Sequence, residues 1–210
     1  MSAQRASSWA YAEAFAPESP VIEAARQRAE QRGGRPVGSG VGATLRMLAA
    51  SVAAHAVVEI GTGGGVSGLW LLEGMPSDGV LTTIDVEAEH QRAAKEAFAD
   101  AGVAHQRTRV IAGRGVDVVR RMTDGAYDLA FVDADAASYP AYVDEATRLL
   151  RPGGVLALNA MFGSDKVADP AARDEATRSL RELGKSIRDD ERFQTVLLPV
   201  GDGLLVAVKR

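Results

Sequence analysis

The run at residues 57–68, Val-Val-Glu-Ile-Gly-Thr-Gly-Gly-Gly-Val-Ser-Gly, constrains the fold of this chain more than any other feature. An apolar stretch carrying one acidic residue leads into a glycine-rich turn, and a helix-like stretch follows at 66–72. Glycines allow positive φ and let a ligand approach the main chain closely. The start of the following helix offers unpaired N–H groups to a polar ligand. The run therefore predicts a cofactor-binding turn at the carboxyl end of a first parallel strand.

Composition limits the class of protein further. The 210 residues, 46% hydrophobic and 25% charged, fit a single α/β domain. The absence of cysteine excludes disulfides and thiolate chemistry and is compatible with the cytoplasm, where we expect the protein to reside. The net charge of −4 disfavours broad nucleic-acid binding. No apolar run reaches the roughly eighteen residues of a membrane span, and the first six residues carry no apolar signal core.

Strand-like and helix-like patterns alternate along most of the chain, which is typical of a parallel sheet covered on both faces. The expected strands are residues 56–60, 80–84, 108–112, 127–132 and 155–158. The expected helices are residues 8–16, 19–31, 41–52, 66–72, 87–101, 116–122, 139–150 and 171–188. Residues 151–154, Arg-Pro-Gly-Gly, are expected to form a turn into the fifth strand.

The C-terminus breaks this alternation. Two strand-like runs, residues 193–200 and 204–209, are joined by Gly-Asp-Gly. A short Asp-Gly linker between two β-rich runs predicts a hairpin, so we expect the sheet to end in an antiparallel pair.

The glycine run also matches the dinucleotide pattern G-x-G-x-x-G, and a nicotinamide-dependent oxidoreductase is one alternative. Three features disfavour it. The carboxylate of Glu59 would repel a pyrophosphate but suits a cation. A C-terminal hairpin is not part of a dinucleotide fold. The Leu-Leu-Arg-Pro-Gly-Gly run at 149–154 is familiar from another fold.

With these motifs the chain resembles the S-adenosylmethionine-dependent methyltransferases, and more narrowly the small cation-dependent O-methyltransferases of the catechol and caffeoyl-CoA type. The resemblance covers the chain from about Val37 to its end. It is carried by Glu59-Ile60-Gly61-Thr62-x-x-Gly65-x-Ser67, Thr83-Ile84-Asp85, Phe131-Val132-Asp133-Ala134-Asp135 and Tyr139.

The resemblance implies a single-domain α/β protein with a Rossmann-like class I methyltransferase fold. We expect a seven-stranded, mostly parallel sheet with a C-terminal antiparallel hairpin. Residues 1–53 would be helices that cover the pocket, and residues 54–210 would form the cofactor-binding core. It also implies a homodimer.

The resemblance further implies S-adenosylmethionine as cofactor. Glu59 and Gly61 would lie beside its methionine part, Ser67 would bond its carboxylate and Asp85 its ribose hydroxyls. From the residues alone, Glu59 could instead be a surface charge, Asp85 a helix cap, Val37 an ordinary apolar loop residue and Asp135 part of a solvated loop. The complete expected cofactor set is Val37, Glu59, Gly61, Thr62, Gly63, Gly65, Ser67, Asp85, Val86, Gly115, Asp133 and Asp135.

The metal site departs from the family pattern. Relatives bind a divalent cation through an Asp after the fourth strand and an Asp-Asn pair after the fifth. Here Asp133 keeps the first position, but Asn159 and Ala160 replace the pair. A family lysine just after the first Asp is also missing. Magnesium prefers carboxylate and other oxygen ligands in octahedral geometry. Two alternatives follow: transfer without a metal, with Asp133 near the reacting oxygen, or weak magnesium binding through Asp133, Asn159 and Asp135.

We expect a small-molecule acceptor that is methylated on a hydroxyl oxygen. Asp133, Tyr139 and Phe162 are the candidate acceptor residues, with Phe162 placed to stack on an aromatic ring. Tyr142 either lines the pocket or packs in the core. The three histidines, at 55, 90 and 105, fall outside the loops at the strand ends and are not expected to be catalytic.

Some assignments stay open. The apolar stripe of Trp9, Tyr11 and Phe15 indicates core or a dimer contact rather than a substrate clamp. Some relatives methylate a hydroxylated uridine of transfer RNA, and a basic strip could serve that substrate. This basic strip would consist of Arg107, Arg109, Arg114, Arg120 and Arg121. A protein that binds the cofactor but has no activity is a further alternative.

Overall fold

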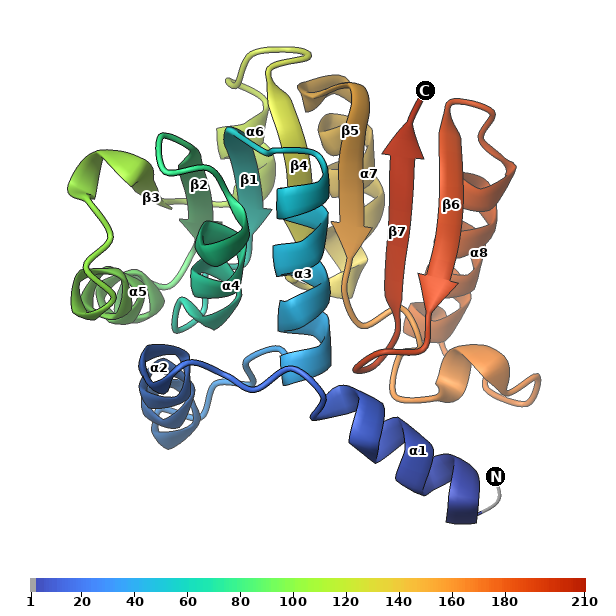
Figure 1. The fold of residues 1–210 in the computed structure, drawn as a ribbon. Helices are drawn as coiled ribbons and strands as arrows, with labels where there is room; N and C mark the ends of the chain where they lie inside the picture. The colour runs from blue at the N-terminus through green and yellow to red at the C-terminus, as the bar shows by residue number, and fades with distance from the viewer. Residues whose placement is uncertain (1–2) are drawn as a thin grey trace.

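Seven strands form one sheet in the order β3-β2-β1-β4-β5-β7-β6 in the computed structural model, which describes residues 3–210 (Figure 1). Six strands run the same way, and β7 runs antiparallel to both of its neighbours. The predicted mostly parallel sheet with a C-terminal hairpin is thereby confirmed. The strands are β1 (Ala56–Ile60), β2 (Val80–Asp85), β3 (Thr108–Ala112), β4 (Tyr127–Val132), β5 (Leu150–Leu158), β6 (Phe193–Leu198) and β7 (Leu204–Lys209).

Helices cover both faces of the sheet (Figure 1). Helices α3, α4 and α5 lie on the near face in that view, and α6, α7 and α8 lie on the far face. No helix within residues 3–210 is long and apolar enough to cross a membrane. The helices are α1 (Ala3–Glu13), α2 (Pro20–Gln31), α3 (Ser39–Ser51), α4 (Val66–Gly74), α5 (Ala88–Asp100), α6 (Gly115–Val119), α7 (Tyr139–Leu149) and α8 (Glu175–Asp189).

The central strands are apolar on both faces because helices bury both faces. In β4 the side chains of Leu129 and Phe131 enter one core cluster, and those of Ala130 and Val132 enter the other. The outer helix α8 instead buries only one stripe. The carboxyl ends of the parallel strands all lie at one edge of the molecule, the lower edge in Figure 1.

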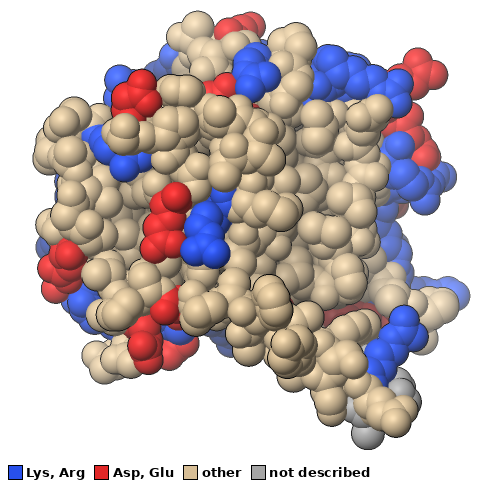
Figure 2. Space-filling view, viewed as in Figure 1, with Lys and Arg blue, Asp and Glu red and all other residues tan. Residues whose placement is uncertain are grey.

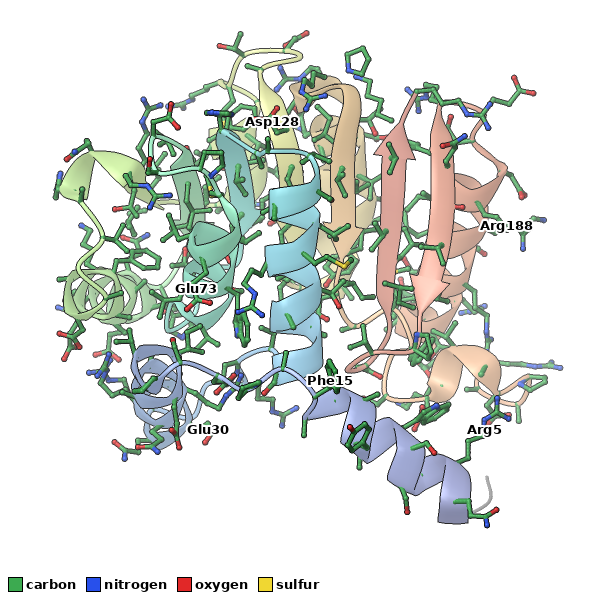
Figure 3. The ribbon with its side chains drawn as sticks, in the orientation of Figure 1. Arg5, Phe15, Glu30, Glu73, Asp128 and Arg188 are labelled. Carbon is green, nitrogen blue, oxygen red and sulfur yellow. The ribbon has the colours of Figure 1, made fainter. Side chains whose placement is uncertain are left out.

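Helix α1 extends away from the body (Figure 1), and the aromatic residues in it and just after it are exposed. Trp9, Tyr11 and Phe15 are 44%, 71% and 72% exposed. The three residues therefore do not pack in the core of the chain, so that interpretation is wrong, and the dimer contact stays a prediction. Figure 2 shows mostly uncharged residues over the face formed by α3, β7 and β6, with charged side chains around its rim. Figure 3 places Phe15 at the surface near the lower end of α3.

Two predicted helix starts are wrong. Helix α1 begins at Ala3 rather than at residue 8, and the Ser8 hydroxyl donates to the carbonyl oxygen of Gln4 within it. The last helix begins at Glu175 rather than at residue 171. Asp174 caps it by accepting a hydrogen bond from the main-chain N–H of Thr177 at 3.0 Å.

Two further boundaries differ. The predicted turn at 151–154 belongs to β5, which starts at Leu150, pairs there with Tyr127 and then shifts register. Helix α6 ends at Val119 rather than at residue 122. Arg148 accounts for the early end, because its guanidinium donates to the carbonyl oxygens of both Val119 and Met122.

Gly61 provides a test of how the sheet edge is packed. Its φ is +102°, and a Cβ there would lie 1.9 Å from the carbonyl oxygen of Asp133. We expect Gly61→Ala to lower the free energy of unfolding by about 3 kcal/mol or more, since backbone strain and overlap add. Gly102→Ala is the control, because Gly102 has a φ of +67° but open space around it. It should cost about 1 kcal/mol. Urea unfolding measures both, and equal losses would contradict the packing argument.

Candidate functional site

The carboxyl ends of the parallel strands are joined by one row of main-chain hydrogen bonds. Each residue just past a strand donates its N–H to the last residues of the neighbouring strand. Parallel pairing thus continues one step beyond the strands and places these residues in line. The bonds are Gly113 to Asp85 at 3.0 Å, Gly61 to Ile84 at 2.9 Å, Asp133 to Ile60 at 2.9 Å and Asn159 to Val132 at 3.0 Å.

A cavity of about 220 Å³ lies next to this row of residues. Its inner wall is the glycine-rich turn, and its outer wall comes from α2 and the loop that follows it. Seven of the predicted cofactor residues line it: Val37, Gly61, Thr62, Gly63, Ser67, Asp85 and Asp133.

A second cavity, of about 280 Å³, adjoins the first. Gly61, Asp85 and Asp133 line both, so the two form neighbouring parts of one site. Three more predicted cofactor residues, Val86, Gly115 and Asp135, line the second cavity, and so does Tyr142.

Gly65 lines neither cavity. It has a φ of +84°, and a Cβ there would lie 3.0 Å from the Cα of Ala94. This glycine allows α4 and α5 to approach each other rather than a ligand to approach the turn.

Asp85 is already engaged on both oxygens. Its Oδ2 accepts the N–H of Gly63 at 3.0 Å and lies 3.2 Å from Nδ1 of His90, while its Oδ1 accepts the N–H of Glu87 at 2.9 Å. His90 lines both cavities, a position that was not predicted for it, while the expectation that it is not catalytic stays a prediction. The position of His90 on the first turns of α5, just after Asp85, is a signal that could have identified it.

The other two histidines do not line these cavities. The N–H of His55 donates to Asp128 at 2.8 Å, and Figure 3 places Asp128 at the opposite, upper edge of the molecule. Two arginines, Arg32 and Arg35, line the first cavity and were missed, because both belong to the loop after α2. The predicted arginine strip is divided: Arg107 donates to the carbonyl oxygens of Pro76 and Gly79, and Arg120 pairs with Glu145.

Glu59 is fully buried behind the turn rather than exposed to either cavity. Its two carboxylate oxygens accept hydrogen bonds from the hydroxyls of Ser67 and Thr83, both at 2.6 Å. Burial raises the pKa of Glu59 to about 7, although these two bonds oppose the shift. The interpretation of Glu59 as a surface charge is therefore wrong. Because the Ser67 hydroxyl gives its proton to Glu59, it cannot donate that proton to a ligand in the cavity.

Asp133 and Asn159 form a pair at the centre of the row. Nδ2 of Asn159 donates to Oδ1 of Asp133 at 3.0 Å, while the buried Oδ1 of Asn159 has no hydrogen-bond partner. Burial raises the pKa of Asp133, and the Asn159 bond partly offsets that rise.

This pair does not match the metal ligands of the family. An amide N–H donor faces Asp133 where a second carboxylate would stand, and Ala160 offers only a methyl group. Ala160 still has a left-handed φ of 55°, which Asn adopts far more readily than Ala. Among residues 3–210 no group of three or more His, Asp or Glu side chains could hold a metal ion.

The two aromatic acceptor candidates lie outside both cavities. Tyr139 is buried, and its hydroxyl donates to the carbonyl oxygen of Asn159 at 3.1 Å. Burial raises the pKa of Tyr139 above its ordinary value. The ring of Phe162 packs on Gly203 of the hairpin turn. Tyr139 therefore supports the Asn159 main chain, and Phe162 supports the hairpin.

Comparison with known proteins identifies the family. The family model described as O-methyltransferase matches residues 13–210. This chain belongs to that family of O-methyltransferases. A curated relative from Mycobacterium sp. (strain JLS), named "Putative O-methyltransferase", is 50% identical over 200 residues, covering 95% of this chain and 91% of the relative. The finding replaces the oxidoreductase alternative.

Solved structures agree with this O-methyltransferase fold. A protein from Corynebacterium glutamicum superposes with a TM-score of 0.89 at 33% identity, covering 95% of this chain and 94% of that one. The O-methyltransferase TomG from Streptomyces achromogenes, involved in tomaymycin synthesis and solved in complex with SAM, gives 0.85 at 27% identity, covering 100% and 99%. An O-methyltransferase from Bacillus cereus in complex with SAH gives 0.86 at 25% identity, covering 97% and 99%.

Buried Glu59 makes the stability of this O-methyltransferase pH-dependent. Its folded pKa of about 7 exceeds the ordinary 4.5, so its protonated form favours folding. That contribution is complete below pH 4.5 and is lost as pH rises through 7, a total of about 3 kcal/mol. We expect Glu59→Gln to abolish this loss. Thermal unfolding from pH 5 to 8.5 should show the wild type falling relative to the variant as pH rises, and parallel curves would disprove the assignment.

Proposed function

We propose that this chain transfers a methyl group from S-adenosylmethionine to a hydroxyl oxygen of a small acceptor. The main support is the placement of Asp85 and Asp133 in one cavity with the glycine-rich turn. S-adenosylmethionine carries a sulfonium, an ammonium and a carboxylate. Carboxylates suit the two cations, while main-chain N–H groups and the cationic Arg35 suit the carboxylate. Relatives of known structure that are named as complexes with SAM and SAH support the same cofactor.

The two neighbouring cavities suggest how the cofactor lies. The methionine part would occupy the first cavity against the turn at 61–64 and Val37. The ribose would meet Asp85, which lines both cavities, and the adenine would enter the second beside Val86 and Gly115. Glu59 would act from behind the turn, by holding Ser67.

Asp133 is the proposed catalytic base. The bound cofactor would supply an electrophilic methyl group on a sulfonium. Asp133 would accept the proton of the acceptor hydroxyl while that oxygen takes the methyl group, and the electron pair of the carbon–sulfur bond would leave with sulfur. The products are the methyl ether, protonated Asp133 and S-adenosylhomocysteine. Alignment of acceptor and cofactor supplies much of the rate, because proximity alone lowers a bimolecular barrier by several kcal/mol.

We also propose that this reaction does not use the divalent cation of the family. The support is the donor set: Asn159 directs an N–H at Asp133, and Ala160 supplies no oxygen ligand from its side chain. The raised pKa of Asp133 suits a base better than a metal ligand, since a base must hold the proton it accepts.

Substitution of Asp133 tests the base. With an acceptor found in a panel of hydroxylated aromatic compounds, we expect Asp133→Asn to lower kcat by about 100-fold or more. Binding of S-adenosylhomocysteine, measured by calorimetry, should change far less because that product lacks the sulfonium charge. Wild-type turnover should persist in EDTA. Unchanged turnover in the variant would remove Asp133 as base, and loss in EDTA with recovery in Mg²⁺ would restore the metal mechanism.

Asn159 tests the electrostatic part of the mechanism. The hydrogen bond from its side-chain amide lowers the pKa of Asp133, so Asn159→Leu should raise that pKa. A base works only when deprotonated, and activity should therefore begin to fall at a higher pH than in the wild type. The acid limb of the kcat–pH profile measures this shift. A limb that stays in place or moves to lower pH would contradict the role of Asn159.

A further inference from the structure

The outer wall of the cofactor cavity is a loop, residues 32–38, that follows α2. Arg32, Gly34, Arg35, Pro36 and Val37 line the cavity from this loop, opposite the glycine-rich turn. The width of the cavity therefore depends on how far the loop stands from the turn. In Figure 1, α2 lies at the lower edge of the molecule, on the side toward which β1 points.

Helix α2 is seated directly on the turn. A Cβ at Gly64 would lie 2.6 Å from the Cβ of Ala29. Ala25, one turn earlier, is buried too. The near end of the loop is fixed to this helix by the N–H groups of Gly33 and Gly34, which donate to the carbonyl oxygens of Glu30 and Ala29 at 2.9 Å each.

The far end of the loop is held by Arg26. Its Nη2 donates to the carbonyl oxygen of Val37 at 2.5 Å. The loop is thus folded back along α2, and the Val37 side chain, 5% exposed, is turned into the cavity wall. The contact joins the middle of α2 to the last lining residue of the loop.

Arg26 is itself held in place by Glu18. Its Nε donates to both carboxylate oxygens, at 3.1 and 2.9 Å, and its Nη2 also contacts Glu18. The two side chains are only 18% and 11% exposed. A planar guanidinium can hold a carboxylate along one edge with two N–H groups and still donate another N–H to a carbonyl oxygen, whereas a lysine ammonium has no such fixed fork.

From these contacts we propose that Arg26 is a positioning residue for the cofactor: held by Glu18, it sets the position of Val37 and of loop 32–38 against the glycine-rich turn. The inference rests on the proposed function, since the cofactor is the ligand of this cavity. Arg26 does not line the cavity. Its loss should therefore weaken cofactor binding and leave the chemistry at Asp133 intact.

The test uses Arg26→Lys, which keeps the charge, and Arg26→Met, which keeps the apolar stem. Arg28→Met is the matched control, because Arg28 lies on the same helix and pairs instead with Asp100 at 3.1 Å. Calorimetry with S-adenosylhomocysteine gives the dissociation constant, steady-state kinetics give KM for S-adenosylmethionine and kcat, and thermal unfolding gives stability.

We expect both Arg26 variants to raise the dissociation constant and KM by about tenfold, as for loss of one hydrogen bond to a charged group. The kcat at saturating cofactor should stay within about twofold, and the control should match the wild type in all three constants. An unchanged dissociation constant, or a fall in kcat without a rise in KM, would overturn the proposal.

Amide hydrogen exchange of the cofactor-free protein gives a second readout. Exchange in loop 32–38 should quicken in Arg26→Lys while β1 stays protected, and equal exchange in the loop would overturn the proposal. If the Arg26 variants do not fold, Glu18→Gln, which weakens the contact between Glu18 and Arg26, should produce the same changes to a smaller degree. The two proposals fail separately: a wild type that binds no S-adenosylhomocysteine refutes the function, whereas tight binding that ignores Arg26 refutes only its positioning role.

Discussion

The row of main-chain hydrogen bonds that joins the carboxyl ends of β3, β2, β1, β4 and β5 is the constraint on which the rest of the structure depends. It brings Asp85, Gly61, Asp133 and Asn159 into line, although they are widely separated in the sequence. The closest approach in this row leaves no room for a Cβ at Gly61. The same contact that closes the sheet edge thus places a carboxylate beside the turn, so the fold and the site cannot be altered independently there.

Electrostatics divides the acidic residues around the turn into different roles. Glu59 is sealed behind it with a raised pKa and two hydroxyl donors, which suits an internal support. Asp85 is held by main-chain N–H groups and stays available to a polar ligand. Asp133 combines partial burial, which raises its pKa, with a single amide donor, which opposes that rise. In the function that we propose, similar residue types serve support, binding and chemistry because their surroundings differ.

Much of this arrangement could be predicted from the sequence because parallel strands bring their carboxyl ends to one edge. Asp85 and Asp133 each follow an apolar run, and β1, β3, β4 and β7 were bounded correctly by their patterns. The hairpin followed from its Asp-Gly linker. Glu59 was placed on the right strand, but its burial depended on two hydroxyls, one of them in another strand.

The rest depends on contacts that sequence patterns do not encode. His90, Arg32 and Arg35 reach the site from helix or loop positions whose orientation is set by packing. Arg26 contributes only through Val37, eleven positions away. Phe162 and Tyr139 contact the hairpin and the Asn159 main chain, contacts that the sequence did not predict, and their role at the acceptor stays a prediction. Helix α8 starts later than expected where Asp174 caps it, and α6 ends earlier where Arg148 binds the carbonyl oxygens of Val119 and Met122.

The central claim is that the glycine-rich turn and Asp85 bind S-adenosylmethionine without help from a metal ion. Calorimetric titration of S-adenosylhomocysteine in EDTA, with NAD titrated in parallel, tests it most directly. The account predicts one molecule bound per chain in the micromolar range, and no heat from NAD. Binding of NAD, or binding of S-adenosylhomocysteine only after Mg²⁺ is added, would contradict it.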